Sequence, residues 1–401
     1  MPLSCEFNTL LKLLSNSLFS TNYTFDENID WNKVMDESIH QSVTALAFDA
    51  TKGIDIPNEI SQKWLMYAVK SISNNYTVTK YHGILHKMMS ENNIPYCVLK
   101  GSASAYYYPN PTLRCMGDVD FLVSHNYYKK AIETFLNDGF ITRGERDDVH
   151  TVFRKGDMHF EMHFEPPGIP ANEPRVIIEN YFKDLIEEST VAELEGNSFI
   201  NPSKFHHGLI LLLHTCHHLL REGIGLRHLC DWAVFVNSFK DDEFVTLFKE
   251  KLEKIGMWNF ACVLTITANK YLGMPLPSSI VTDFSKFNGL IDDIFVSGNF
   301  GKKAENRYFE SLYIKSKNTL GKTENRSKQF ISSINNIIYS KHRSVKKLKI
   351  LLPFFWLFYG SRYFVRYAFG KRKAILNKEI IDSAGKRKSI YDDFHLFETE
   401  K

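Results

Sequence analysis

The spacing of apolar residues along the chain changes character twice. From about 5 to 90 apolar residues recur three and four positions apart, as in "KWLMYAVKSI", which predicts helices. From 94 to about 200, short apolar runs alternate with turn residues and an amphipathic stretch, which predicts the order β-α-β-α-β-β. Helical spacing returns after the Pro-rich segment "PPGIPANEP". The predicted fold class is α+β, with an α/β-like core of a small mixed sheet flanked by N-terminal helices and a C-terminal helical bundle.

These changes divide the chain into four predicted regions. They are an N-terminal helical region at 1–90, an α/β domain at 91–200, a helical bundle at 201–280 and a less periodic region at 281–401. Within the α/β domain, "IPYCVLK" and "GDVDFLV" are predicted strands, and "HTVFRKGDMHFEMHFE" is predicted to form two strands that meet at Gly156-Asp157.

Two aspartates interrupt the apolar pattern of the predicted strand "GDVDFLV". Residues two apart on a strand point to the same face, so Asp118 and Asp120 project together while Val119, Phe121 and Val123 fill the opposite, buried face. Neighbouring ionised carboxylates repel each other unless a divalent cation lies between them, and oxygen ligands suit Mg²⁺ or Mn²⁺. The alternative is a strand edge with two solvated acids.

A third acid follows on the strand "MHFEMHFE", where His159, Glu161 and His163 share one face. If this strand neighbours the first, three carboxylates would hold two metal ions, activate a hydroxyl and stabilise a leaving pyrophosphate. A second interpretation is that the two histidines and Glu161 form a zinc or iron site of a metallohydrolase, which leaves the aspartates unexplained. A third is a polar face that lines a cleft.

A Gly-Ser pair precedes these aspartates at the start of a predicted helix. Gly101 lets a phosphate approach the backbone, and the free N–H groups after it attract anions. Lys100 and Arg114 add positive charge on either side. We therefore predict that Lys100, Gly101, Ser102 and Arg114 bind phosphate groups.

The combination resembles the DNA polymerase β-type nucleotidyltransferase superfamily. More narrowly, "LKGSASAYYYPNPTLRCMGDVDFLV" resembles the uncharacterised nucleotidyltransferase family, whose members share a "KG…YP.P..R..gDiDllv" segment. The resemblance covers roughly residues 30 to 370. Two further family motifs are matched by Glu161-Met162-His163 and by His214, His218, Arg227 and Asp231.

The resemblance implies metal-dependent transfer of a nucleotidyl group from an NTP, with ATP as the default donor. It implies that Gly101 and Ser102 hold the triphosphate, that Asp118 and Asp120 ligate Mg²⁺ or Mn²⁺, and that Glu161 completes the site as a ligand or as a base. The family commonly has Asp at this last position, and Glu is one methylene longer. The acceptor implied is a hydroxyl group on a sugar, another small molecule, a protein side chain or an RNA end, for example in polysaccharide or secondary metabolite synthesis.

The predicted helix "HHGLILLLHTCHHLL" carries His207, His214 and His218 on one face. His214 and His218 have the spacing of zinc ligands, but packing against the α/β domain explains the histidines equally well. A further hypothesis is that His163, His218, Arg227 and Asp231 line the cleft and bind substrate. Arg227 and Asp231 are also four apart on a helix, so a salt bridge between them is the simpler alternative.

A basic and aromatic segment lies near the C-terminus. Residues 341–373 contain ten Lys or Arg, no Asp or Glu and nine aromatic residues, with Pro353 in the first turn of a predicted helix and Gly370 at its end. The helical period places Tyr359, Arg362, Tyr363 and Arg366 on one side. Such a helix suits an anionic membrane surface or a lipid-linked acceptor. Packing against the helical bundle is the favoured alternative, and nucleic-acid binding is a third.

Overall charge and cysteine content narrow the class of protein. A net charge of +3 does not favour a general nucleic-acid binder. Six scattered cysteines without a CxxC pair, and an N-terminus without a basic leader, predict a cytoplasmic protein, with peripheral contact at the inner membrane face if the C-terminal helix binds lipid. The sequence thus predicts a cytoplasmic nucleotidyltransferase, and the alternative from another class is a non-catalytic nucleotide-binding or membrane-associated partner protein.

Overall fold

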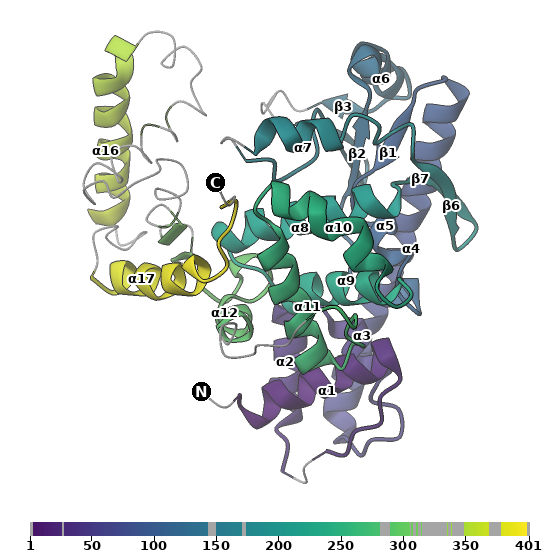
Figure 1. Ribbon diagram of the computed structural model, residues 1–401, viewed down its shortest axis with the longest axis vertical. Coiled ribbons are helices and arrows are strands. Elements are labelled where there is room, and N and C mark those ends of the chain that lie inside the picture. The colour runs from purple at the N-terminus through teal and green to yellow at the C-terminus, as the bar shows by residue number, and fades with distance from the viewer. Residues whose placement is uncertain are drawn as a thin grey trace.

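The computed structural model describes residues 3–25, 28–142, 150–170, 174–280, 289–304, 349–368 and 378–398, together with 306–307, 310–311, 314, 335 and 338. Figure 1 shows α1 to α3 at one end, the larger sheet at the other, and α8 to α11 between them. The first helices are α1 (Cys5–Phe19), α2 (Trp31–His40), α3 (Thr44–Asp49) and α4 (Asn58–Glu91). The helical pattern of the first 90 residues therefore predicts this part of the chain correctly.

The larger sheet has five strands in the order β1-β2-β5-β4-β3, of mixed direction, which confirms the predicted α+β class. The two strands predicted around Gly156 are present as β4 and β5, whereas β3 is a short additional edge strand that the pattern does not predict. The elements are β1 (Tyr96–Val98), α5 (Ser102–Ala105), β2 (Val119–Val123), α6 (Tyr128–Asn137), β3 (Ile141–Thr142), β4 (His150–Lys155) and β5 (Met158–His163).

The register of β2 and β5 determines which side chains meet. The two strands are parallel and pair Asp120 with Glu161. On the opposite face of β2, Val119, Phe121 and Val123 are fully buried, as the alternation predicts. The acidic face of one strand therefore lies directly beside the acidic face of the other.

The hydrophobic interior forms two clusters, and α4 contributes to both. Trp64 near its start belongs to a cluster with α1 and α8 to α11, whereas Val78 and Leu85 belong to a cluster with Phe121 and Phe160 under the sheet. A helix of 34 residues is about 51 Å long, so α4 extends from the helical end of the molecule to the sheet. It contacts α3 at one end and β7 at the other.

The remainder of the described chain is mainly helical. After the sheet come α7 (Arg175–Tyr181), the hairpin β6 (Thr190–Leu194) and β7 (Asn197–Asn201), α8 (Lys204–Leu220), α9 (Leu226–Asn237), α10 (Glu243–Lys254), α11 (Trp258–Leu272), α12 (Leu290–Ser297), α16 (Leu352–Ala368) and α17 (Lys378–Asp392). Among the described helices, none is both long and apolar enough to span a bilayer.

Some predictions are not decided by this architecture. The four domain boundaries and the cytoplasmic location stay predictions. Pro353 lies in the first turn of α16, as expected, but the side chains of Arg362, Tyr363 and Arg366, and all of Gly370, fall outside the described residues.

Candidate active site

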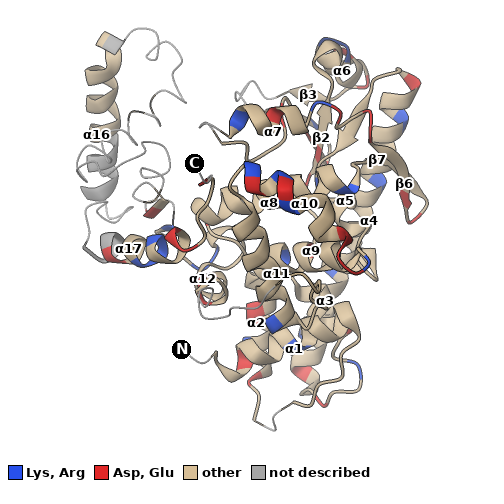
Figure 2. Ribbon diagram, in the orientation of Figure 1, with Lys and Arg blue, Asp and Glu red and all other residues tan. Residues whose placement is uncertain are grey.

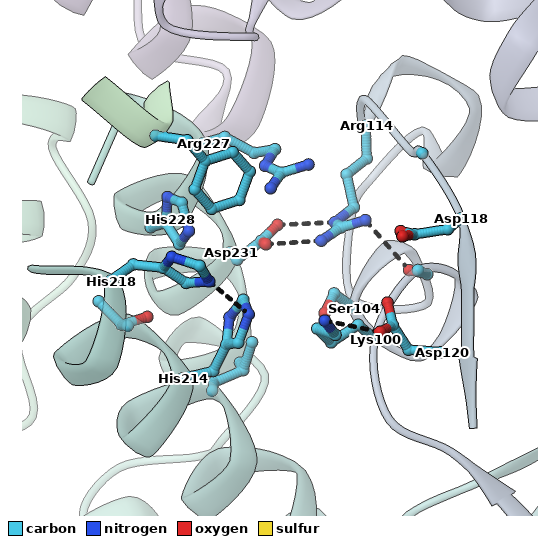
Figure 3. A pocket seen from close by; sticks show the side chains of 15 residues that line it. Lys100, Ser104, Arg114, Asp118, Asp120, His214, His218, Arg227, His228 and Asp231 are labelled. Atoms are coloured by element: carbon cyan, nitrogen blue, oxygen red, sulfur yellow. Dashed lines mark hydrogen bonds and ion pairs between the residues drawn. The ribbon is translucent and has the colours of Figure 1, made fainter. Parts of the chain in front are cut away.

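A pocket of about 270 Å³ lies between the sheet and the helices α8 and α9. One wall comes from β2 and the turns around α5, and the other comes from α8, α9 and a loop near residue 300. Figure 3 shows the carboxylates of Asp118 and Asp120 on one side and the histidines of α8 and α9 on the other. The lining residues are Lys100, Gly101, Ser104, Arg114, Gly117, Asp118, Asp120, Leu211, His214, Thr215, His218, Arg227, His228, Asp231 and Phe300.

Asp120 is buried and holds two cationic or polar partners on one oxygen. Lys100 Nζ and His163 Nε2 each lie 2.8 Å from Asp120 Oδ1. Burial alone would raise the pKa of Asp120, but the Lys100 ammonium and the hydrogen bond from His163 lower it far below its ordinary value. Asp120 is therefore ionised at neutral pH, as a metal ligand must be.

Glu161 has the opposite electrostatic environment. Burial, followed by the nearby charges of Asp120 and Asp118, raises the pKa of Glu161 to about 7. Burial is the larger cause, and the two neighbouring aspartates add to it, because nearby negative charge disfavours the ionised form of a further carboxyl. A divalent cation would remove that repulsion, so the donor set fits a metal ion.

The side chains around these acids form two groups that could each hold a metal ion. Asp118, His159 and Glu161 offer one set of ligand atoms, and Asp120, Glu161 and His163 offer the other, with atoms within 4.8 Å of one another in each set. Glu161 belongs to both. Each group mixes carboxylates with one imidazole, so oxygen-only ligation, which we expected from the sequence, describes only part of the donor set.

The turn before α5 is built around a glycine that no other residue can replace without strain. Gly101 has φ 64°, and a Cβ placed there would lie 2.9 Å from the His82 ring of α4. Burial lowers the pKa of His82 to about 4, so the ring is neutral; its Nδ1 donates to the carbonyl of Val78 (2.9 Å).

Ser102 is fully buried and does not line the pocket, whereas Ser104, one turn after Gly101, does.

Arg114 forms a bidentate ion pair with Asp231 across the two walls. Its Nε and one terminal nitrogen donate to the two carboxylate oxygens at 2.8 and 2.7 Å, and the other terminal nitrogen donates to the Gly101 carbonyl at 3.3 Å (Figure 3). Tyr108 Oη also donates to Asp231 (2.6 Å). Burial would raise the pKa of Asp231, but Arg114 lowers it. Asp231 thus pairs with Arg114, and no ion pair joins it to Arg227 among the described residues, so the predicted alternative of an Arg227–Asp231 salt bridge is wrong.

The loop that carries Arg114 is fixed by α4. Asn75 Nδ2 donates to the Thr112 carbonyl (2.7 Å), and its Oδ1 accepts from the Met116 amide (2.9 Å). Asn74 Nδ2 donates to the Met116 carbonyl (2.7 Å). Three side-chain hydrogen bonds thus hold the loop backbone and position the guanidinium at the pocket.

The helical wall presents three uncharged imidazoles. Burial lowers the pKa of His214, His218 and His228. His218 Nδ1 lies 3.2 Å from Glu222 Oε2, and its Nε2 lies 3.0 Å from His214 Nε2, so the neutral rings form a short hydrogen-bonded chain. A zinc site of three histidines is not among the candidate metal groups of the described residues.

The sequence-predicted residues occupy three different positions. Lys100, Gly101, Arg114, Asp118 and Asp120 line the pocket with the helical residues His218, Arg227 and Asp231. Glu161 and His163 lie on β5 beside Asp120 and are not among the pocket-lining residues. His207 is fully buried and stacks on Tyr107, which supports the packing interpretation for this histidine alone.

The sequence interpretation missed Ser104, His228 and Phe300. Ser104 lies at i+3 from Gly101 and so shares its helix face, which is a usable signal. His228 follows Arg227 directly. Phe300 lies between two glycines in "GNFG", and that pattern was the only indication of a special backbone.

The family described as uncharacterised nucleotidyltransferase matches residues 27–273. The chain belongs to this family. The matched segment includes every pocket residue except Phe300. Membership supports a nucleotidyltransferase-like activity with a nucleotide substrate and a divalent metal, for which the carboxylate groups offer a site.

Comparison with other proteins adds little to the family assignment. A search of curated proteins finds no match. A solved structure of an antigenic nucleotidyltransferase-like protein from Paracoccidioides brasiliensis is similar over 51% of this chain and 95% of that chain, with 14% identity and a TM-score of 0.30. At that score the likeness does not bear on the site.

Proposed function

We propose that this member of the nucleotidyltransferase family transfers an NMP group from an NTP to a hydroxyl acceptor with the help of Mg²⁺ or Mn²⁺. The observation that carries the proposal is the parallel register of β2 and β5, which sets Glu161 beside Asp120 and two positions along the ladder from Asp118. Three carboxylates converge there, next to the Lys100-Gly101 turn that lines the pocket.

Asp118, Asp120 and Glu161 would hold the metal, with His159 and His163 as further donors. A bound divalent ion supplies charge stabilisation of the phosphoryl group and lowers the pKa of an acceptor hydroxyl. Because Glu161 belongs to both candidate groups, it is the carboxylate best placed to be shared between two ions. His163 orients Asp120 through the hydrogen bond at 2.8 Å.

The cations of the pocket differ in how freely they can bind phosphate. Arg114 uses three of its nitrogens on Asp231 and backbone carbonyls, so its role is to join the two walls. Arg227 has no carboxylate within ion-pair distance among the described residues, and its Nε is buried without a partner. Lys100 pairs with Asp120 at 2.8 Å and would be released for phosphate if a metal ion took its place there. We therefore assign phosphate binding to Lys100 and the Gly101 backbone, which leaves the Arg227 guanidinium available to another part of the nucleotide.

The test is pyrophosphate release from each of the four NTPs with Mg²⁺ or Mn²⁺ and a panel of hydroxyl acceptors. Asp118→Asn and Asp120→Asn should each lower the rate by about 100-fold or more, since each removes a charge that the metal requires. Asp157→Asn, at the exposed β4–β5 turn, is the matched control and should match wild type. Equal rates in all four proteins would refute the proposal, and nucleotide binding without turnover would favour the non-catalytic alternative.

A second function, a metallohydrolase, is favoured by one observation. Each candidate metal group contains an imidazole, which suits zinc or iron better than magnesium. This alternative predicts stoichiometric zinc or iron in the purified protein, measured by mass spectrometry, and its loss in the His159→Ala/His163→Ala double variant. The nucleotidyltransferase proposal predicts instead that added Mn²⁺ or Mg²⁺ is needed for activity.

The basic and aromatic segment supports a separate proposal, contact with an anionic membrane surface. Phe354, Leu357 and Phe358 lie within one third of the circumference of α16 and are 55% to 72% exposed, and Ile350, in the turn just before the helix, is 79% exposed. Trp356 on the other side is partly buried and donates to Asn335 Oδ1 (2.8 Å). One side of α16 therefore contacts Asn335, which lies outside the predicted bundle at 201–280, while the other side is apolar and exposed, so packing against that bundle stays a prediction.

Charge supports the membrane as the partner. Figure 2 shows no charged residue on the coloured part of α16, whereas the surrounding segment 341–373 holds ten Lys or Arg and no acid. Apolar insertion flanked by basic residues is the pattern of helices that lie in an anionic interface. The Phe354→Glu/Leu357→Glu variant should lose flotation with phosphatidylserine vesicles, while Val176→Glu, at an exposed apolar site on α7, should not. Equal flotation of wild type and double variant would refute membrane contact.

A further inference from the structure

The loop between α12 and the residues after it has an unusual backbone. Phe300 has φ 55° and ψ 39°, the left-handed conformation that a bulky side chain rarely adopts. Gly298 and Gly301 on either side also have positive φ, at 64° and 69°. A strained residue of this kind persists only where its surroundings determine the conformation and commonly marks a functional site.

The surroundings of the loop hold this conformation. Asn299 is buried and its Nδ2 donates to Ser42 Oγ (2.9 Å). A Cβ at Gly301 would lie 2.7 Å from the carbonyl oxygen of Glu222, so the backbone passes too close for any other residue. The loop is therefore clamped between α2 and the end of α8, and the clamp directs the ring of Phe300 into the pocket.

Phe300 meets three polar side chains of the helical wall. Its ring centroid lies 4.6 Å from that of His218, 5.2 Å from that of His228 and 5.1 Å from the Arg227 Cζ. Yet 36% of the Phe300 side chain stays exposed, although a large aromatic side chain at the edge of a pocket gains from being covered. The Arg227 guanidinium lies over the ring, so two planar groups that can stack meet at the edge of the pocket.

Two hydrogen-bond donors at this surface lack partners among the described residues. The Gly225 amide donates to His228 Nδ1 (3.3 Å), so the neutral ring carries its proton on Nε2, and that atom is buried with no acceptor. The His228 side chain is itself more than nine-tenths buried. Arg227 Nε is also buried without an acceptor. An unsatisfied buried donor beside a pocket is explained by a ligand that accepts its hydrogen bond.

We propose that Phe300, Arg227 and His228 form the subsite for the nucleobase of the donor nucleotide. The inference rests on the proposed function and adds to it the group that this wall recognises. Aromatic and guanidinium planes stack on bases, and a base offers ring nitrogens or carbonyl oxygens to the free donor of His228. The carboxylates and Lys100 on the opposite wall remain for the metal and the phosphates. Phe300 lies beyond the family-matched segment, which ends at residue 273, so this part of the pocket is supplied by a separate stretch of chain.

Equilibrium binding of two probes tests the subsite. The probes are an ATP analogue that cannot be cleaved between the α and β phosphates and inorganic tripolyphosphate, each with Mn²⁺ and without acceptor. Phe300→Gly removes the ring and suits the positive φ, so the variant should be as stable as wild type. It should bind the analogue about 5- to 150-fold more weakly, the effect of losing one base stack, and bind tripolyphosphate unchanged. Phe300→Tyr should retain the affinity.

The matched control is Glu195→Gly, which relieves a positive φ of 49° in the exposed β6–β7 turn and should change neither affinity. Equal weakening for both probes would show that Phe300 only holds the pocket together, and unchanged affinity for the analogue would also overturn the inference. In the second case, a raised KM for an acceptor in Phe300→Gly would assign the ring to the acceptor. If wild type binds neither probe, the proposed function fails with it.

Discussion

The crowding of three carboxylates gives a prediction about the metal-free protein. Replacing Glu161 with Gln keeps the size of the side chain and its ability to hydrogen-bond Asp118, but removes the charge that Asp118 and Asp120 oppose. In chelator, at a pH above neutrality, Glu161→Gln should therefore be more stable than wild type. Removing this proposed active-site carboxylate would thus stabilise the metal-free fold, because no cation offsets the repulsion between Glu161 and the two aspartates.

The size of this effect follows from the pKa of Glu161, about 7 instead of the ordinary 4.5. A pKa that is raised on folding means that the protonated carboxyl is favoured in the native state. The contribution of the Glu161 carboxyl to the free energy of unfolding is thus fully present below its pKa in the unfolded chain, near 4.5. It is lost as the pH rises through the folded pKa of about 7. The full difference between the unfolded and folded pKa of Glu161 corresponds to about 3 kcal/mol of stability. Because 19% of the side chain is exposed, solvent screening reduces this value to about 1–2 kcal/mol.

Urea denaturation in chelator at pH 4.5 and pH 8 measures the free energy of unfolding. Wild type and Glu161→Gln should coincide at the lower pH and separate at the higher, with the variant more stable. Glu193→Gln, an exposed acid on β6, is the control and should follow wild type at both values. Saturating Mn²⁺ should reverse the order at pH 8, because wild type gains more from binding the metal. A variant that is less stable than wild type in chelator at pH 8 would refute the electrostatic reasoning.

Three further predictions concern the polar residues around the pocket. Asp231→Asn leaves the buried guanidinium of Arg114 without a counter-ion and should lower the free energy of unfolding by about 3–5 kcal/mol in a urea titration. Gly101→Ala places a methyl group against His82 at a positive φ and should cost about 1–3 kcal/mol by the same measurement. Lys100→Met should tighten Mn²⁺ binding and weaken NTP binding, each by about tenfold in calorimetric titrations, because the ammonium competes with the metal but attracts the phosphates.

Local pattern was enough to predict the acidic half of the site. The period-two alternation on β2 fixed the face of Asp118 and Asp120, and the same alternation on β5 fixed that of Glu161. Only the pairing of the two strands remained to be found. The same alternation places His159 and His163 on the face of Glu161, and the sequence predicts them as metal ligands only in the alternative zinc or iron site.

Contacts between distant segments were beyond prediction from sequence. Asp231 had a plausible partner four residues away on its own helix, yet it pairs with Arg114, which is 117 positions away in the chain. Both Arg114 and Asp231 are buried, so the distant pair gives a buried guanidinium the counter-ion that it needs, which a pair between Asp231 and Arg227 would not. Similarly, no residue preference predicts a left-handed Phe300, since the conformation is imposed by Asn299 and Gly301 through tertiary contacts.

The ion pair between Arg114 and Asp231 has a consequence for how a substrate enters. Many transferases open and shut two lobes around their ligands, and a hinge between the lobes sets the pace of turnover. Here two buried, charge-assisted hydrogen bonds from Arg114 to Asp231 join the two walls of the pocket. Tyr108 donates a third hydrogen bond to the same carboxylate. Separating the two walls would break all three of these hydrogen bonds. For the proposed transfer, this arrangement predicts that a nucleotide meets two walls already joined across the pocket, so that any opening of the walls must first break these three hydrogen bonds.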